Sequence, residues 1–187
     1  MKAMIPAKTL RRIVMATRGF VSKAGSNRPA YEYIKLEFSK GNSSVTAVAV
    51  DGYRLSVEHA SCDVDEDFSA YIKPMLPPIK GNEWAMVTVD GERAYVEIGG
   101  LAAGFVQPKE VEFDYRGVVD NARKNAPTYR IGFNGDFLLT ALKAAKESCG
   151  ASFKLPVILE FRGPNEPILL VTNSGDDVKM VLPVRIK

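Results

Sequence analysis

Residues 45–57 constrain the fold more than any other stretch of this chain. Six apolar or β-branched residues precede Asp51-Gly52, and strict alternation of apolar and polar residues follows. Asp-Gly between two such runs predicts a tight two-residue β-hairpin, because a type I′ turn needs positive φ at both central positions. Since residues 45–50 are apolar on both faces, this strand is expected inside a sheet rather than at its edge. Taken alone, this stretch is explained by an ordinary hairpin in a β-rich domain.

A pattern of strand, helix and three strands is repeated around this hairpin. The helices are expected over residues 6–23 and after Asn134, a candidate N-cap. Three prolines between residues 74 and 80 exclude a regular helix from the second repeat. A second Asp-Gly hairpin is expected at Asp90-Gly91. The predicted strands are 31–39, 45–50, 53–60, 68–73, 85–89, 93–98, 102–108, 128–133, 156–161, 168–172 and 178–186.

This order of elements indicates an α+β fold. Each repeat would lay one helix over a small antiparallel sheet, and neighbouring repeats would join their sheets to cover strand edges. Residues 109–127 are interpreted as a connection, and its last part, after Val119, is mostly polar. The 187 residues, 46% of them hydrophobic and 25% charged, are typical of a globular protein with a substantial core.

The composition predicts a cytoplasmic protein. No apolar run reaches the length of a membrane span, and the first residues lack the apolar segment of a signal peptide. Two cysteines do not make a disulfide framework.

Positive charge is concentrated at the start of the chain. Residues 1–30 contain seven Lys and Arg and no acid, although the net charge of the whole chain is only +3. Such a segment favours contact with a polyanion, and a solvated basic helix face explains it equally well. On the helix over residues 6–23 and the helix after Asn134, the side chains expected to face nucleic-acid phosphates are Lys8, Arg11, Arg12, Arg18, Lys143 and Lys146.

Catalytic and metal sites have little support. His59 and Cys62 are spaced like two zinc ligands, but no second pair lies at ligand spacing. A hydrolase using Cys62 or Cys149 with His59 is an alternative for which no orienting group is evident. No phosphate-binding loop occurs, so we expect no cofactor and no catalytic residues.

Four segments resemble the bacterial DNA polymerase III beta subunit family, the sliding clamps. They occur in the family's order and cover most of the chain. The segments are Ala49-Val50-Asp51-Gly52-Tyr53-Arg54-Leu55-Ser56, Phe113-Asp114-Tyr115-Arg116-Gly117-Val118, residues 131–143, and Met180-Val181-Leu182-Pro183-Val184-Arg185-Ile186.

The resemblance implies a DNA-clamp fold in a shortened chain. Residues 1–118 resemble the clamp's middle domain, with two repeats, and residues 119–187 resemble its last half-domain. The family's ring contains about twelve such units, so a ring of this chain would need about four copies. Such a ring would encircle duplex DNA and tether a replicative polymerase. The alternative is a truncated clamp paralogue that forms no ring and competes for clamp partners.

The resemblance also implies a pocket for peptides of DNA polymerases and clamp loaders. The matching residues are Val50, Gly52, Tyr53, Arg54, Leu55, Val118, Leu182, Pro183, Val184 and Arg185. Tyr53 replaces the family's His, Val50 its Thr and Phe113 its Pro, while Leu182 and Val184 replace two methionines. Because methionines are adaptable contacts, an altered peptide preference is expected.

Overall fold

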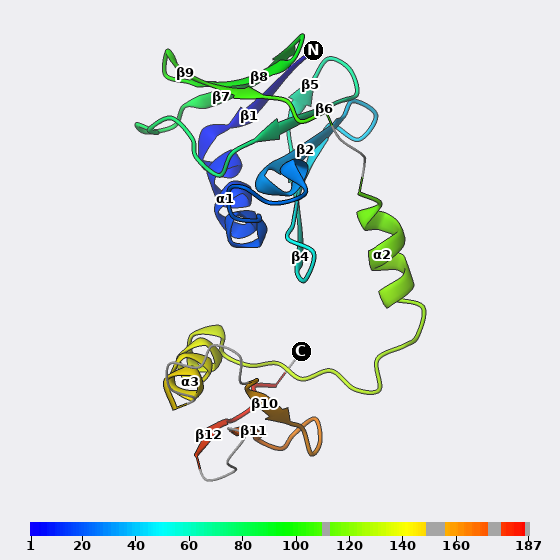
Figure 1. The fold of residues 1–187 in the computed structure, drawn as a ribbon, viewed down its shortest axis with the longest axis vertical. Helices are drawn as coiled ribbons and strands as arrows, with labels where there is room; N and C mark the ends of the chain where they lie inside the picture. Colours follow the sequence, from blue (N-terminus) through cyan, green and yellow to red (C-terminus); the bar gives the residue numbers. More distant parts are fainter. Residues whose placement is uncertain (110–112, 149–155, 172–176, 186–187) are drawn as a thin grey trace. The chain divides into compact units, whose positions relative to one another are not determined.

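A computed structural model describes residues 1–109, 113–148, 156–171 and 177–185 (Figure 1). The chain divides into two compact units, Met1–Asn121 and Ala122–Lys187.

The first unit contains a four-stranded antiparallel sheet in which β3 lies inside. Its strands are β2 (Ile34–Ser39), β3 (Ser44–Val50), β4 (Leu55–Ser61) and β6 (Phe68–Ile72), in the order β4-β3-β2-β6. Alternate side chains of β2 are buried, as the two-residue period of a strand requires. The inner position predicted for residues 45–50 is confirmed.

A second sheet of five antiparallel strands completes the unit. Its strands are β1 (Lys2–Pro6), β5 (Asp63–Val64), β7 (Trp84–Asp90), β8 (Arg93–Ile98) and β9 (Leu101–Val106), in the order β5-β1-β7-β8-β9. The β7–β8 turn consists of Gly91 and Glu92, because Asp90 pairs with Arg93. This turn lies one residue later than predicted, and its Gly91 has a φ of +55°.

The two repeats of this unit exchange their leading strands. β1 begins the first repeat but pairs with β7 of the second, with Ile5 opposite Ala85. β6 begins the second repeat but pairs with β2 of the first, with Phe38 opposite Phe68. The rings of these two phenylalanines stack with centroids 4.5 Å apart. Buried side chains of both repeats therefore form one core.

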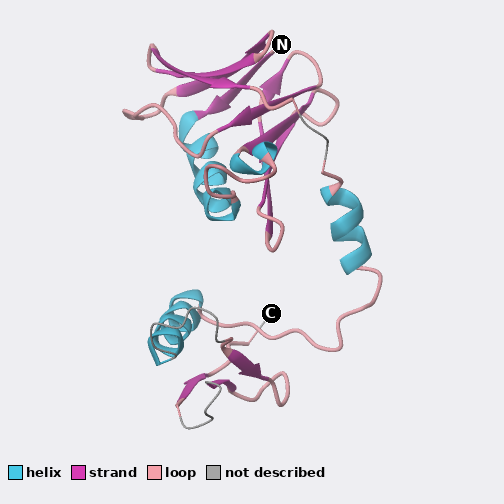
Figure 2. Ribbon diagram, viewed as in Figure 1, coloured by secondary structure: helices cyan, strands magenta, loops and turns pink. Residues whose placement is uncertain are grey.

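Helix α1 (Ala7–Thr17) packs against β3, β4 and β7 (Figure 2). Its apolar stripe is buried as predicted, but the helix ends at Thr17 instead of residue 23. A short 3₁₀ turn, η1 (Arg18–Phe20), follows and contains the helix-breaking Gly19. A second 3₁₀ turn, η2 (Pro29–Glu32), precedes β2, so the strand predicted from residue 31 begins at Ile34. Residues 74–80 form no helix, as expected.

The second unit has one helix and one small sheet. Helix α3 (Gly135–Ser148) packs against β11 (Ile168–Val171) and β12 (Val178–Val181), and β10 (Ile158–Glu160) completes the order β10-β11-β12. Asn134 caps the helix as predicted, because its Oδ1 accepts from the amides of Asp136 at 2.9 Å and Phe137 at 3.2 Å.

Of two other predictions for the later part of the chain, one is wrong and one is incomplete. Residues 128–133 form no strand; only Gly132 makes a β-bridge, with Val184. The connection predicted over 109–127 contains helix α2 (Tyr115–Ala122). Its first turn is capped by Asp114, whose Oδ1 accepts from the amide of Gly117 at 2.9 Å.

The exchange of leading strands predicts how the first unit unfolds. Ile5→Ala deletes a fully buried side chain of β1 where it joins the sheet of the other repeat. We expect it to lower the free energy of unfolding by about 2–5 kcal/mol. Urea denaturation should show one cooperative transition shifted as a whole. Val106→Ala, at an exposed position of β9, is the control and should change stability little. Separate transitions for the two sheets would contradict the joint core.

Candidate functional site

A segment after β9 crosses the outer face of the four-stranded sheet and is held there by Glu37. The Tyr115 hydroxyl donates to Glu37 Oε2 at 2.8 Å, and the Arg116 guanidinium donates to the same oxygen at 2.5 Å. Lys35 Nζ lies 2.8 Å from Glu37 Oε1. The carboxylate therefore fixes residues 113–116 against β2.

Burial and these donors shift two pKa values. Burial alone would raise the pKa of Glu37, but hydrogen bonds from Lys35, Tyr115 and Arg116 outweigh it, so the net pKa is lowered. Burial, followed by the neighbouring Glu37 carboxylate, raises the pKa of Tyr115 to about 12. Glu37 is therefore ionised and Tyr115 protonated at neutral pH.

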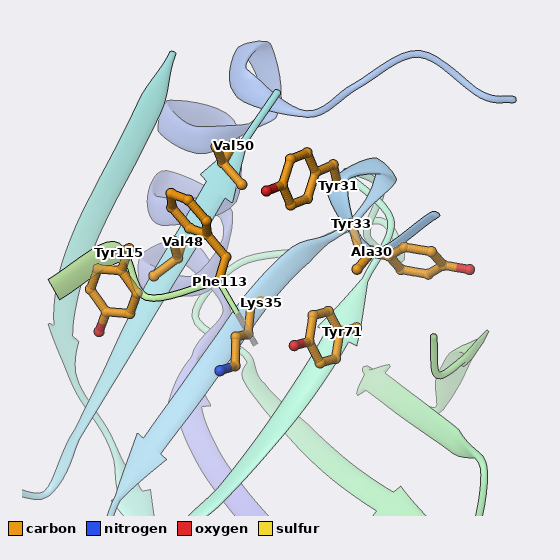
Figure 3. Close-up of a pocket in the computed structure, with 9 residues that line it drawn as sticks. All are labelled: Ala30, Tyr31, Tyr33, Lys35, Val48, Val50, Tyr71, Phe113 and Tyr115. Atoms are coloured by element: carbon orange, nitrogen blue, oxygen red, sulfur yellow. The ribbon is translucent and has the colours of Figure 1, made fainter. Parts of the chain in front are cut away.

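An aromatic pocket lies where this segment meets the sheet (Figure 3). The Tyr31 and Phe113 rings meet edge to face with centroids 5.9 Å apart, and the Tyr33 and Tyr71 rings do so at 6.5 Å. The pocket is lined by Ala30, Tyr31, Tyr33, Lys35, Val48, Val50, Tyr71, Phe113 and Tyr115. Such apolar and aromatic walls suit the hydrophobic side chains of a peptide.

Of the residues predicted to bind a peptide, Val50 lines this pocket and the others in the first unit lie beside its strand or on α2. Val50 pairs with Leu55, so the connecting loop has four residues, not the predicted two. The Asp51 carboxylate explains the difference, because its Oδ1 accepts from the amides of Tyr53 at 3.0 Å and Arg54 at 2.8 Å. Only Gly52 in this loop has positive φ, at +91°.

The loop presents one aromatic ring and one anchored arginine. Tyr53 is 97% exposed, whereas Leu55 is half-buried. The Arg54 guanidinium is held by Asp51, with Nε 2.9 Å from Oδ2, and lies over the Phe20 ring at 5.6 Å. Hydrogen bonding from Arg54, and then from the Tyr53 amide, lowers the pKa of Asp51. The loop is therefore fixed by its own polar contacts while Tyr53 remains open to solvent.

The remaining predicted pocket residues lie on α2 and after β12. Val118 is an exposed side chain of α2. In the second unit, Leu182 and Val184 are exposed, Pro183 is half-buried and Arg185 is exposed. The Val184 amide donates to the Gly132 carbonyl at 2.8 Å, which anchors this segment. The meeting of the two walls in one pocket stays a prediction.

The six basic residues predicted to face DNA are all exposed. Lys8 donates to Asn82 Oδ1 at 2.8 Å, and Arg12 forms an ion pair with Glu58 at 2.9 Å. Lys8 lies in the first turn of α1, which contains no acid, so its charge opposes the helix dipole, whereas Arg18 at the C-cap is favourably placed. Helix stability therefore does not explain the charge of Lys8. Lys143 and Lys146 lie on α3 in the second unit.

Cys62 is a poor candidate nucleophile. It is buried, and desolvation followed by the neighbouring Asp63 charge raises its pKa to about 11. His59 is exposed, with Nδ1 3.1 Å from Thr46 Oγ1. Cys149 lies outside the described residues. Within the described ranges, no group of three or more His, Cys, Asp or Glu side chains could hold a metal ion. No helix in that part of the chain is long and apolar enough to cross a membrane.

Comparison with solved structures identifies the fold. The whole chain matches 50% of the sliding clamp of Bacillus subtilis, with a TM-score of 0.78 and 17% identity. A putative DNA polymerase III beta subunit from Eubacterium rectale matches with a TM-score of 0.79 and 12% identity. That match covers 98% of this chain and 50% of the other. A Helicobacter pylori beta clamp bound to a DNA ligase peptide matches with a TM-score of 0.69 and 15% identity. This match also covers 98% of this chain and 50% of the other.

These likenesses show that the chain has the DNA-clamp fold. More particularly, it is the fold of bacterial DNA polymerase III beta sliding clamps, as the resemblance in the sequence predicted. The chain spans about half the length of the clamps it matches. Neither the protein-family models nor the curated proteins gave a match.

Glu37 provides a test of how the pocket wall is held. Glu37→Gln removes the charge that anchors residues 113–116, and we expect a loss of about 1–3 kcal/mol in unfolding free energy at pH 7. Because the folded pKa of Glu37 is lowered, its contribution is present above the unfolded pKa and is lost as pH falls through the folded value. The difference between variant and parent should therefore shrink in acid.

Glu92→Gln is the matched control for this measurement. Glu92 is 80% exposed and forms only a long ion pair with Lys109, at 3.9 Å. Urea denaturation at neutral and acidic pH should show little change for this variant. An equal effect of both substitutions, or a Glu37→Gln effect independent of pH, would contradict the anchoring role.

Proposed function

We propose that this chain is a clamp-type processivity factor that acts without catalysis. Copies of the chain would form a ring around duplex DNA and tether a polymerase through a peptide-binding pocket. The observation that carries this proposal is the whole-chain likeness to sliding clamps, combined with an aromatic pocket beside the loop that resembles their partner-binding segment.

The pocket supports the binding of a short peptide. Its sheet side is rigid because β3 lies between two hydrogen-bonded neighbours, and Val48 and Val50 project from it. Tyr53 and Leu55 extend the surface beyond the pocket. The Helicobacter pylori clamp that shares the fold binds a DNA ligase peptide, and we extend peptide binding of this kind to the present chain. Peptides of DNA polymerases and clamp loaders are the proposed partners.

The basic residues support loose contact with DNA. Lys8, Arg11, Arg12 and Arg18 would contact phosphates, and Lys143 and Lys146 would add to them from the second unit. None of these contacts would read a base, so binding would be independent of sequence and sensitive to salt. Encirclement would retain DNA topologically, and the contacts could then remain weak enough for sliding.

A non-ring adaptor is the second candidate. The chain spans only half the length of the clamps that it resembles, and its aromatic pocket lies entirely within the first unit. A single copy could therefore hold a peptide and compete with a full-length clamp for partners.

Peptide binding tests the proposed pocket. We expect Leu55→Asp and Leu182→Asp each to weaken a labelled polymerase-derived clamp-binding peptide by roughly tenfold or more, because a charge is placed against its apolar side chains. Fluorescence anisotropy measures the change. Leu101→Asp, at an exposed position of β9, is the control and should retain parental affinity. Loss in the control alone, or no loss in either pocket variant, would contradict the pocket.

Retention on DNA separates the ring from the adaptor. A ring loaded on nicked circular DNA should stay bound during gel filtration and be released when the circle is linearised. Reversing charge with Arg11→Glu and Lys143→Glu should reduce loading and flatten its salt dependence. Equal loss from circular and linear DNA would contradict encirclement, while peptide binding would then support the adaptor.

A further inference from the structure

The first unit shows a rule for the two edges of a leading strand. One edge of β1 pairs with β5, which follows the last strand of its own repeat, and the other pairs with β7 of the second repeat. β6 pairs with β2 of the first repeat. On its other side, Gln107 lies just after β9 and exchanges hydrogen bonds of 2.8 and 2.9 Å with the Tyr71 backbone. Each leading strand therefore lies between the end of its own repeat and the sheet of the other repeat.

The third repeat satisfies only half of this rule. Its leading segment, residues 128–133, precedes α3 as β1 precedes α1. Gly132 bridges to Val184, which follows β12 as β5 follows β4. On the other edge of this segment, no strand pairs with it among the described residues. The outer edge of β10 is equally without a paired strand in the described ranges.

The exposure of apolar side chains around β10 also points to this unpaired edge. Residues 34–38 of β2 and 157–161 around β10 have the same apolar pattern. Leu36 and Phe38 are 0% and 3% exposed, whereas the corresponding Leu159 and Phe161 are 41% and 46% exposed. Clustered apolar side chains beside an unpaired edge are typical of an interface.

We propose that two copies of this chain pair through their third repeats. Each copy would place residues 128–133 against the outer edge of β10 in the other copy. A second copy is the fitting partner because it carries both a leading segment without a sheet and a β10 edge without a strand. One two-fold axis would satisfy both. The pairing does not rest on the proposed function, because its basis is the strand exchange within the first unit.

The register follows from the buried positions of the first unit. Ile5 lies two residues before α1 and opposite Ala85, and Ile72 lies opposite Ile34. Phe133 lies two residues before α3, and Phe133 and Val157 each pack against the small core of the second unit. Phe133 therefore corresponds to Ile5, and Val157 to Ala85.

In this register, apolar residues meet across the two-fold axis. Phe133 lies opposite Val157, Ile131 opposite Leu159, and Tyr129 opposite Phe161, where Phe68 and Phe38 stack in the first unit. On the other face, Arg130 lies opposite Glu160, which also pairs with Arg162 at 2.5 Å. Opposite charges favour such a cross-strand pair. A shift by one residue would place Arg130 on the apolar face.

Sedimentation of the full chain tests the pairing. We expect the parent chain to associate at micromolar concentration and Leu159→Glu to raise the dissociation constant by roughly tenfold or more. Leu101→Glu, an equally charged change at an exposed leucine of the first unit, should leave association unchanged. A monomeric parent chain, or an unaltered Leu159→Glu variant, would overturn the proposal. Peptide affinity measured on the same samples separates this failure from failure of the proposed pocket.

Crosslinking tests the register even where Leu159→Glu disturbs folding. In a chain with Cys62→Ala and Cys149→Ala, the pair Arg130→Cys and Glu160→Cys should oxidise to a reductant-sensitive dimer, since directly opposed strand positions suit a disulfide. The control pair, Arg130→Cys and Lys179→Cys, places the second thiol on β12, two strands away. Equal dimer yields from both pairs, or no dimer from the first, would overturn the proposed register.

Discussion

The exchange of leading strands is the interaction on which the structure of the first unit depends. A sheet of three strands leaves an edge of unpaired amides and carbonyls, and each repeat fills the edge of the other. Neither repeat can then bury its apolar face alone, so their side chains make one core with α1 across it. The prolines of residues 74–80 remove the helix of the second repeat, and α1 remains the helix that covers this core among the described residues.

The candidate site follows from the same pairing. Because β6 lies beside β2, Tyr71 is brought opposite Lys35 and next to Tyr33. Glu37 lies two residues after Lys35 in β2, and it holds the segment with Phe113 and Tyr115 over these rings. The pocket is therefore made of a rigid sheet and a segment fixed by charge-assisted hydrogen bonds, which are stronger than neutral ones. Rigid walls of this kind lower the entropic cost of binding a peptide.

The sequence correctly predicted those elements whose structure depends on residues close together in the chain. The apolar residues on both faces of β3 indicated an inner strand, and Asn134 marked the start of α3. The four-residue loop after β3 was missed because the Asp51 carboxylate binds two amides of its own loop and so displaces the two-residue turn. β1 was missed because its strand conformation depends on pairing with β7, about 80 residues later.

The site was predictable only in part for the same reason. Resemblance to a family drew attention to Val50–Leu55 and to residues 182–185, but not to the tyrosines. In the sequence, Tyr31, Tyr33 and Lys35 recur at every second position, and this spacing was the available signal. Their meeting with Tyr71 and Phe113 depends on long-range register that no short segment encodes. The uncovered β10 edge likewise becomes evident only by comparison with β2 and β7 in the folded first unit.

The rule that a leading strand completes the sheet of another repeat is tested most directly by amide hydrogen exchange on the full chain. Exchange at Ile131 and Leu159 should be measured at increasing protein concentration. The account expects protection of both amide regions to rise together with concentration, while protection within β3 stays constant. Rapid exchange at residues 128–133 and in β10 at every concentration would contradict it.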